Sequence, residues 1–268
     1  MKIFKIIDED QNFEIGHILY YEKCQDFIIH LHEGLDEWSA PLLFTKYVKE
    51  GVYTIPRDAS ILWIRERIIP SDRQNIGDIL SNARLKSYSE VKLLELSHGK
   101  CSQDNIRVEL TGTLPDYIKE REGHNLEECF PLDNRNILCF FNDSTVRKID
   151  LSQLSQIDTA INIEKALKNS ALFQSAQVGP GGYSMTFDNT IDVPASILYT
   201  SGLEIPLTLH DFKLFVAHNV LDTTQASELL ECSRQNISYL ANQSRLTPVK
   251  EDVRGTLYLR GEVVKNSW

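Results

Sequence analysis

Short apolar runs separated by polar turns dominate the first 35 residues of the chain. Ile3 to Ile7, Phe13 to Tyr21 and Phe27 to Leu31 are rich in β-branched and aromatic residues. Runs of this length and composition, bounded by polar turns, are typical of strands. The pattern therefore predicts a three-stranded antiparallel meander.

Helical spacing replaces this pattern in the next section. Apolar residues recur there three or four positions apart, with proline or serine at the points where helices would begin. The spacing predicts helices over Asp36 to Lys49, from Pro56 to Ile69, from Ser71 to Leu80, and over Ser87 to Leu96. A charged stretch with glycine and proline, Asp116 to Asn134, reads as a linker. We place a domain boundary within it, near residue 128.

Residues 129–203 alternate between strand and helix patterns. Strands are predicted over Ile137 to Phe141, Val146 to Ile149, Phe173 to Val178, Tyr183 to Phe187 and Ile191 to Val193. Short helical pieces are predicted over Leu151 to Leu154, Ile161 to Leu167 and Pro194 to Tyr199. Gly179 to Gly182 and the Asp188-Asn189 pair supply turns between strands. The order predicts a small α+β unit.

This unit resembles the bacterial domain of unknown function called DUF twenty-four forty-two. The resemblance rests on Phe140 to Leu151, Leu172 to Gln174 and Thr190 to Tyr199. Where that family often has a tryptophan before an Asn-Gly turn, this chain has Phe187-Asp-Asn. Its members often stand beside a small partner gene, in what look like toxin–antitoxin pairs, and others are fused to a helix-turn-helix. The resemblance implies no catalytic residues.

The stretch Asp222 to Leu240 carries the clearest functional pattern. It predicts two short helices around a tight turn, preceded by a helix over Leu209 to Val220. Asp222, Thr223 or Thr224 can cap the first helix, because their side-chain oxygens accept free backbone amides, and Ser233 can cap the second. Ala226, Leu229 and Leu230 share a face of the first helix, and Ile237 and Leu240 share a face of the second.

These residues resemble a helix-turn-helix of the excisionase or MerR type. The match rests on Thr224-Gln-Ala, the leucine pair, Ser233-Arg-Gln and Ile237, although Glu231 occupies a turn position that is commonly glycine. Strands over Arg245 to Lys250 and Thr256 to Arg260 would form a wing. We expect DNA contacts from the exposed side of the second helix and from the wing, namely from Ser233, Arg234, Gln235, Ser238, Tyr239, Asn242, Lys250 and Arg254.

Charge supports a restricted DNA-binding surface. The formal net charge is −10, which argues against a protein that binds nucleic acid over its whole surface. From Cys232 to the C-terminus, however, there are six basic and three acidic residues. The segment expected to face DNA is therefore locally basic.

The cysteine spacing and the hydropathy argue against a zinc or disulfide scaffold and against a membrane protein. Five scattered cysteines without a Cys-x-x-Cys pair suggest neither a zinc ribbon nor a disulfide scaffold. No apolar run reaches the roughly 20 residues that a membrane helix needs, and no signal-peptide pattern is visible. We expect a soluble cytoplasmic protein that does not bind a membrane.

Three arginines near Pro70 form a candidate anion or partner site. Arg65, Arg67 and Arg73 could hold an anion or a carboxylate of a protein partner. The alternative, which we favour, is a set of ion pairs with nearby acidic residues, namely Glu66, Asp72 and Asp78.

Two further pairs of residues could bind a metal or act in catalysis. His30 and His32 alternate on one strand face and could ligate a metal, but we interpret them as half-exposed strand histidines because no third ligand is visible. His98 and Cys101 could pair as base and nucleophile, but no oxyanion or orienting motif accompanies them. We therefore expect no enzyme activity, no metal and no cofactor.

The sequence thus predicts an α+β chain of three domains. Residues 1–128 would form a β-meander with helices, residues 129–203 a small α+β domain, and residues 204–268 a winged helix-turn-helix. The first functional hypothesis is a sequence-specific, homodimeric transcriptional regulator whose N-terminal portion is an adaptor or sensor. The alternative is an antitoxin-like module that binds a protein partner and has no DNA site of its own.

Overall fold

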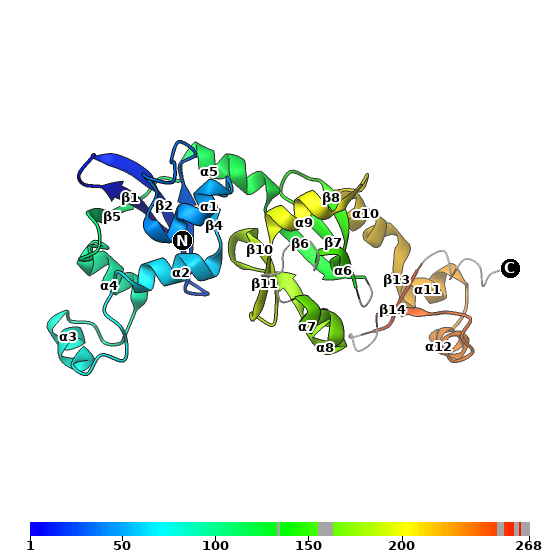
Figure 1. Cartoon of the computed structure of the whole chain (residues 1–268). Helices are drawn as coiled ribbons and strands as arrows, with labels where there is room; N and C mark the ends of the chain where they lie inside the picture. The colour runs from blue at the N-terminus through cyan, green and yellow to red at the C-terminus, as the bar shows by residue number, and fades with distance from the viewer. Residues whose placement is uncertain (133–134, 155–162, 251–254, 260–262, 264–268) are drawn as a thin grey trace.

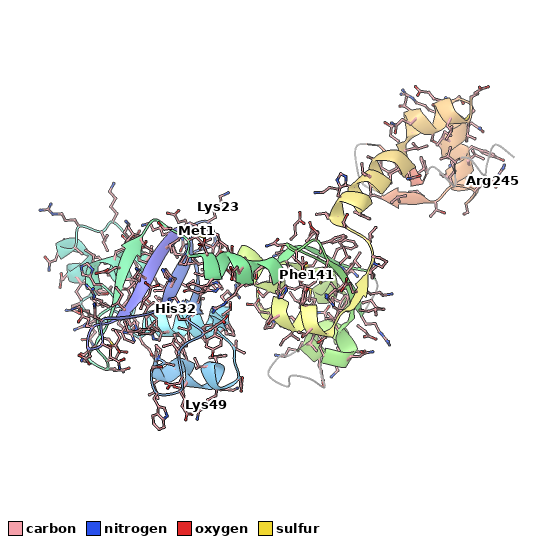
Figure 2. The ribbon with its side chains drawn as sticks, turned by 90° about the horizontal axis from the view of Figure 1, so that it is seen from above. Met1, Lys23, His32, Lys49, Phe141 and Arg245 are labelled. Carbon is pink, nitrogen blue, oxygen red and sulfur yellow. The ribbon has the colours of Figure 1, made fainter. Side chains whose placement is uncertain are left out.

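The computed structural model describes residues 1–268 except 133–134, 155–162, 251–254, 260–262 and 264–268. The described chain is a mixed α+β fold with four antiparallel sheets. Figure 1 shows these sheets in a row, with the N-terminal sheet at one end and the last two labelled helices, α11 and α12, at the other. Figure 2, from above, shows the same order through the labelled residues His32, Phe141 and Arg245.

The N-terminal sheet contains the expected meander and two further strands. Its order is β4-β3-β2-β1-β5, formed by β1 (Lys2–Asp8), β2 (Phe13–Tyr21), β3 (Asp26–Leu31), β4 (Thr54–Ile55) and β5 (Ile106–Thr111). The antiparallel pairing of β1, β2 and β3 confirms the predicted meander. The apolar pattern of the sequence did not predict β5, which pairs with the free edge of β1 although the two strands are about a hundred residues apart.

A β-bulge in β2 changes the direction of its side chains. Ile6 pairs with Gly16 whereas the next residue, Ile7, pairs with Glu14, so that Ile15 is an extra residue in the strand. A bulge of this kind re-aims the side chains on either side of it. Gly16 is required at this point, because a Cβ there would lie 2.1 Å from the carbonyl oxygen of His30.

Three helices and one 3-10 turn, η1 (Leu42–Phe44), α1 (Thr45–Lys49), α2 (Arg57–Arg65) and α4 (Glu90–Ser97), contribute the core residues on one face of this sheet. A further helix, α3 (Ile76–Asn82), has no buried residue and projects away from the sheet in Figure 1. Phe44, Trp63 and Leu94 are fully buried in the core between helices and sheet. The predicted helix over Asp36 to Lys49 is shorter than expected, since it begins only after Pro41, and Trp38 is 87% exposed.

The predicted linker is instead ordered structure. It contains α5 (Asp116–Arg121), η2 (Glu122–His124) and β6 (Leu126–Pro131). Ile118 of α5 is fully buried against the second face of the N-terminal sheet. The boundary expected near residue 128 falls inside β6, which pairs with β7 along its length. The charged composition suggested a linker, but most of these charges lie on the exposed side of α5 and β6, and Arg121 instead donates to the Leu31 carbonyl of the N-terminal sheet.

Two sheets form the middle of the molecule, with orders β12-β8-β7-β6 and β11-β10-β9. Their strands are β6, β7 (Asn136–Phe141), β8 (Val146–Asp150), β9 (Ala176–Val178), β10 (Ser184–Phe187), β11 (Ile191–Pro194) and β12 (Leu203–Ile205). The accompanying helices are α6 (Leu151–Leu154), α7 (Ile163–Lys168), α8 (Ser170–Gln174), η3 (Pro180–Gly182) and α9 (Ala195–Ser201).

Most of the predicted order in this part is confirmed, with one exception. The strand predicted over Phe173 to Val178 begins as α8, because the Asn169 side chain accepts the Leu172 amide at 3.2 Å and caps a helix there. The turn expected at Asp188 and Asn189 is present, and both residues have positive φ, of 49° and 52°.

The N-terminal and middle sheets meet at a buried polar contact around Tyr183. The Tyr183 hydroxyl donates to Glu122 Oε1 at 2.8 Å and lies 2.8 Å from His30 Nε2. Burial lowers the pKa of His30 to about 3, so its neutral ring can donate to the Tyr183 oxygen. A second contact joins the same two parts, where Arg57 of α2 pairs with Asp192 of β11 at 2.9 Å.

The C-terminal part continues from α10 (Leu209–Asn219) into a small three-stranded sheet with two helices. The sheet order is β13-β15-β14, from β13 (Val220–Asp222), β14 (Pro248–Lys250) and β15 (Leu257–Leu259), and the helices are α11 (Thr223–Leu229) and α12 (Arg234–Asn242). Phe212 of α10 packs on Phe130 and Phe140 of the middle sheet, with ring centroids 6.2 and 6.1 Å apart.

Gly182 of η3 provides a test of the close packing against β6, beside Tyr183. An alanine Cβ there would lie 2.3 Å from the Leu126 carbonyl oxygen, and the residue has a φ of +75°. We expect Gly182→Ala to lower the free energy of unfolding by more than about 1 kcal/mol, because neither the backbone nor φ can relax freely. Chemical denaturation measures the change.

Gly77 is the matched control for this substitution. It lies in α3, it does not have a positive φ, and a Cβ added to it would meet no atom within 4 Å beyond the backbone of its own helix. Alanine is a better helix former by roughly 0.5–1 kcal/mol, so Gly77→Ala should leave stability unchanged or raise it. Equal losses in both variants would contradict the packing described at Gly182.

Candidate functional site

Local side-chain hydrogen bonds define the start of α11. The Asp222 side chain accepts the Gln225 amide at 2.8 Å, and the Gln225 side chain accepts the Asp222 amide at 3.0 Å. This reciprocal capping box satisfies two amides that the helix leaves free. Of the three capping residues considered from sequence, the structure selects Asp222. Ala226 is buried as expected, but Leu229 is 39% exposed.

The turn between α11 and α12 has the geometry that usually calls for glycine. Glu231 has a φ of +51°, in the left-handed region. The Cys232 amide donates to the Ser227 carbonyl at 2.9 Å across the turn. The position that the sequence pattern marked as unusual is therefore a left-handed position, occupied here by a residue for which that conformation is sterically unfavourable.

Ser233 begins α12 as predicted. Its side chain accepts the Asn236 amide at 3.2 Å. Ile237 is fully buried and Leu240 is 5% exposed, and both pack in the C-terminal core with Ala226 and Tyr258. Two buried residues three positions apart fix which side of α12 faces the protein.

The other side of α12 is polar and exposed. Successive residues in an α-helix are turned by about 100°, so the expected contact residues fall within an arc of roughly 140°, centred opposite the two buried side chains. These residues are Arg234, Gln235, Ser238, Tyr239 and Asn242, and all five are exposed. The fold thus brings together the helix residues that the sequence singled out.

Individual members of this arc differ in what else they contact. Within the described residues Arg234 makes no ion pair, and Tyr239 is 57% exposed. The Ser238 hydroxyl donates to the Arg234 carbonyl at 3.4 Å, within the helix. The Ser233 oxygen is engaged as the helix cap. Arg234, Gln235, Tyr239 and Asn242 are therefore the members most free to meet a ligand.

The expected wing is described only at its base. β14 pairs with β15, and β15 pairs with β13, so that the hairpin is anchored beside α11 and α12. Lys250, at the end of β14, is exposed. Arg254, at the expected tip, lies outside the described residues.

The N-terminal arginines have separate partners. Arg67 is buried, pairs bidentately with Asp104 and donates to the Gly99 carbonyl at 3.1 Å. Its guanidinium also lies 3.8 Å from the Trp63 ring centroid. Arg65 pairs with Glu90 at 2.7 Å, and Arg73 is exposed. Arg65 and Arg67 are ion-pair members, as favoured from sequence, but with partners more distant in the chain than those expected.

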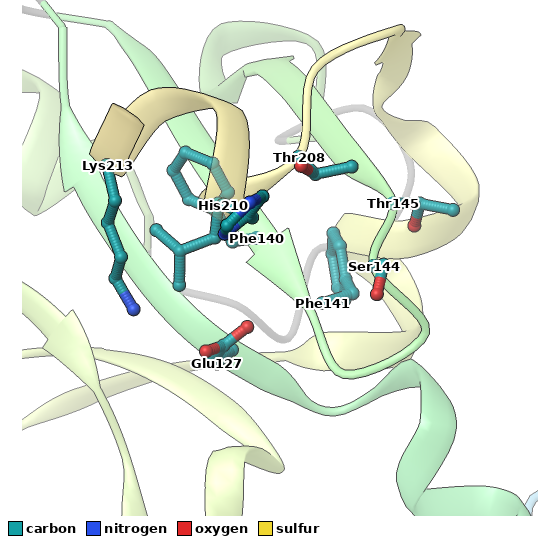
Figure 3. Close-up of a pocket in the computed structure, with 9 residues that line it drawn as sticks. Glu127, Phe140, Phe141, Ser144, Thr145, Thr208, His210 and Lys213 are labelled. Carbon is teal, nitrogen blue, oxygen red and sulfur yellow. The ribbon is translucent and has the colours of Figure 1, made fainter. Parts of the chain in front are cut away.

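Two pockets accompany these elements. The first, of about 410 Å³, lies between β7 and the start of α10, where Figure 3 shows Glu127, His210 and Lys213 around it together with Phe140 and Phe141. Its charges are mixed in sign, so it selects no single class of ligand. The second, of about 540 Å³, lies where α5 approaches the end of β3 and is lined by His32, Glu33, Gly34, Tyr117, Glu120, Arg121 and His124.

His30 of β3 and His32, which follows β3, do not form the pair considered from sequence. His30 is buried and contacts Tyr183, so it is not half-exposed. His32 instead lies 3.0 Å from Glu14 Oε1, and His17 Nδ1 lies 3.5 Å from the same oxygen. Sequence alternation could not reveal this group, because Glu14 and His17 are three apart and share a face only through the bulge at Ile15.

The His98 and Cys101 pair also separates. His98 ends α4 in a left-handed conformation and is exposed. The Cys101 sulfur lies 3.4 Å from Arg67 and 3.6 Å from Asp104. The thiol therefore belongs to the buried arginine–aspartate group.

No protein-family model, curated protein or solved structure matches this chain. The two family resemblances described from sequence motifs remain predictions. No helix in the described ranges combines the length and the hydropathy needed to cross a membrane.

Substituting Arg67 and Arg65 in turn compares the stability contributed by a buried arginine with that contributed by an exposed one. Arg67→Met should lower the free energy of unfolding by about 3 kcal/mol, because it leaves Asp104 without its buried partner. Arg65→Met, at a position that is 62% exposed, should change it by no more than about 0.5 kcal/mol. Urea denaturation compares the two. Small and equal effects would mean that the fold does not hold Arg67 in place, and would restore the anion-site hypothesis.

The left-handed turn gives a second prediction. Glu231→Gly should stabilise the α11–α12 pair by up to about 1 kcal/mol, because a left-handed non-glycine residue costs about 1–2 kcal/mol and glycine's greater freedom when unfolded offsets only part of this. Glu231→Val should destabilise it, since β-branched residues strongly disfavour positive φ. Amide hydrogen exchange in peptides covering α11 and α12 measures both changes, and the reverse order would contradict the turn geometry.

Proposed function

We propose that this chain is a sequence-specific DNA-binding transcriptional regulator that reads DNA with α12. The observation that carries the proposal is the exposed polar arc of α12, which lies opposite Ile237 and Leu240. Arg234 and Gln235 stand at the N-terminal end of the helix, where recognition helices contact base edges. Arginine pairs with guanine and glutamine with adenine through two hydrogen bonds each.

The surrounding elements support the proposal by their order. A helix, a strand, two helices and a hairpin follow one another as α10, β13, α11, α12, β14 and β15, with the sheet order β13-β15-β14. This order supports the proposal, because it is typical of a winged helix-turn-helix, in which a hairpin lies beside the recognition helix. Lys250 at the base of the hairpin is placed to approach a phosphate, and Arg254 is assigned the same role from its sequence position.

The distribution of charge supports DNA binding through the C-terminal part and not through the rest of the chain. The whole chain carries a net charge of −10, whereas the segment from Cys232 onward has six basic and three acidic residues. Repulsion from the remainder would keep DNA away from other surfaces, because phosphate contacts dominate nucleic-acid affinity. Because only one end of the molecule is basic, DNA would bind with that end, and with α12, toward it.

The three-unit organisation completes the proposal. Separate apolar cores lie under the N-terminal sheet, within the middle sheets and around α11 and α12. The N-terminal unit acts as a sensor or docking unit, and the middle unit as an adaptor that binds protein. The active form is a homodimer, because paired half-sites need two reading helices.

Substitution of Arg234 tests this function. Duplexes selected from a randomised library with the full-length protein supply the DNA probe. Arg234→Ala should weaken binding by about 1–3 kcal/mol, or roughly 5- to 150-fold, through loss of a bidentate base contact. Its melting temperature should stay almost unchanged, because an exposed residue without an ion pair contributes little to stability. Fluorescence anisotropy and thermal melting measure the two quantities.

Arg73→Ala is the matched control, since Arg73 is an exposed arginine in the N-terminal part. It should change neither affinity nor melting temperature. Wild-type affinity should fall with salt at a slope of about 2–5 counterions per protomer, as expected for few phosphate contacts. If no duplex is enriched at low salt, the regulator proposal fails and the antitoxin-like alternative takes its place. If DNA binds but Arg234→Ala has no effect, α12 is not the reading helix.

A further inference from the structure

Three side chains with metal-ligating atoms converge beneath α5, far from α12. Glu14 and His17 come from β2, and His32 follows β3 directly. Glu14 Oε1 lies 3.0 Å from His32 Nε2 and 3.5 Å from His17 Nδ1, and no two of the three ligand atoms are more than 4.8 Å apart. His17 is 3% exposed, whereas Glu14 and His32 are each 32% exposed, so the group is reached from one side.

The backbone holds these residues together. The bulge at Ile15 turns Glu14 to the same face as His17, and the amide of His32 donates to the Ile15 carbonyl at 3.0 Å. Gly16 allows β3 to approach this point closely. The site is therefore built on paired strands rather than on loose loops, which limits how far its members can move.

The separations match those of ligands around one ion. Nitrogen and oxygen ligands bind zinc at about 2.1 Å, so that two of them at a tetrahedral angle lie roughly 3.4 Å apart. The two measured separations from Glu14 Oε1 lie on either side of this value. We propose that Glu14, His17 and His32 form a binding site for a divalent transition-metal ion of the zinc class.

Neighbouring groups orient the ligands in the way metal sites require. Lys5 binds the second carboxylate oxygen of Glu14, Oε2, at 2.8 Å, which leaves Oε1 directed at the histidines. The Tyr117 hydroxyl lies 3.0 Å from His17 Nδ1, the nitrogen that faces Glu14, so a bound ion would take the place of this hydrogen bond. The Tyr117 ring packs against the His32 ring with centroids 4.5 Å apart, and a supporting contact of this kind fixes the orientation of a ligand.

Cations close to the group are already paired. Arg121 lies over the Tyr117 ring at 4.9 Å, but its guanidinium pairs with Glu33 at 3.1 Å and donates to the Leu31 carbonyl at 2.8 Å. Lys5 is paired with Glu14 itself. His30, on the neighbouring strand position, is directed to Tyr183. The charge of Arg121 is thus compensated by Glu33, which reduces its repulsion of an incoming cation.

The ligand set indicates both the metal class and an open position. Two imidazoles and one carboxylate suit zinc and similar ions, whereas magnesium and calcium prefer oxygen ligands alone. Three protein ligands leave a fourth position of a tetrahedral ion for water or another small ligand. His32 and Tyr117 also line the pocket beneath α5. The fourth position accordingly faces a pocket that a small anionic or neutral donor can enter. This inference is independent of DNA binding by α12.

Metal titration of the full-length, metal-stripped protein tests the site. Zn²⁺ should bind with one ion per chain in calorimetry, and Co²⁺ should give visible bands without the strong near-ultraviolet absorption of a cobalt–thiolate bond. Glu14→Gln and His32→Ala should each weaken Zn²⁺ binding at least about tenfold, since even supporting residues change metal affinity by about 10–100-fold. Both residues are partly exposed, so the variants should fold, and melting curves without metal verify this.

The controls separate this site from other zinc-binding groups. His98→Asn removes an exposed histidine at a left-handed position that asparagine tolerates, and should leave Zn²⁺ affinity unchanged. Mg²⁺ should not compete with Zn²⁺. Equal affinity in the wild type and His32→Ala would overturn the proposal. So would thiolate absorption with Co²⁺, which would place the ion on a cysteine, or the absence of stoichiometric binding by the folded wild type.

Discussion

The buried contact around Tyr183 joins the N-terminal and middle parts of this molecule. Its hydroxyl lies between the carboxylate of Glu122 and the ring of His30, and burial of these polar groups is tolerated only because each has a partner. Gly182 brings the backbone close enough to Leu126 to place the tyrosine there. The direction in which the middle sheets, and through them α10 and the C-terminal helices, extend from the N-terminal sheet depends on this contact.

The N-terminal sheet has two faces with different chemistry. Helices cover one face with a continuous apolar core around Phe44 and Trp63. On the other face, Ile118 of α5 buries a small apolar patch, and Leu114 and Tyr183 pack beside it. This small patch leaves part of that face open, and the polar side chains grouped around His17 occupy it. A pocket and a candidate metal site can therefore lie beside a sheet whose opposite face is fully packed.

The C-terminal part depends much less on distant contacts. Its helices are defined by the capping box at Asp222, the left-handed residue Glu231 and the cap at Ser233, all within twelve residues. Ile237 then faces the core, and the exposed arc follows from helix geometry alone. Phe212 ties this part to the middle sheet through α10.

Local sequence determined the first three strands, the turns and the helices around Glu231, because strand alternation, caps and left-handed positions depend on neighbouring residues. It also identified the α12 residues that share one exposed face. Tertiary structure alone decided the pairing of β5 with β1 and the partner of Arg67, since both join segments distant in sequence. It alone brought Glu14, His17 and His32 together, because one bulged residue reverses the alternation from which strand faces are predicted.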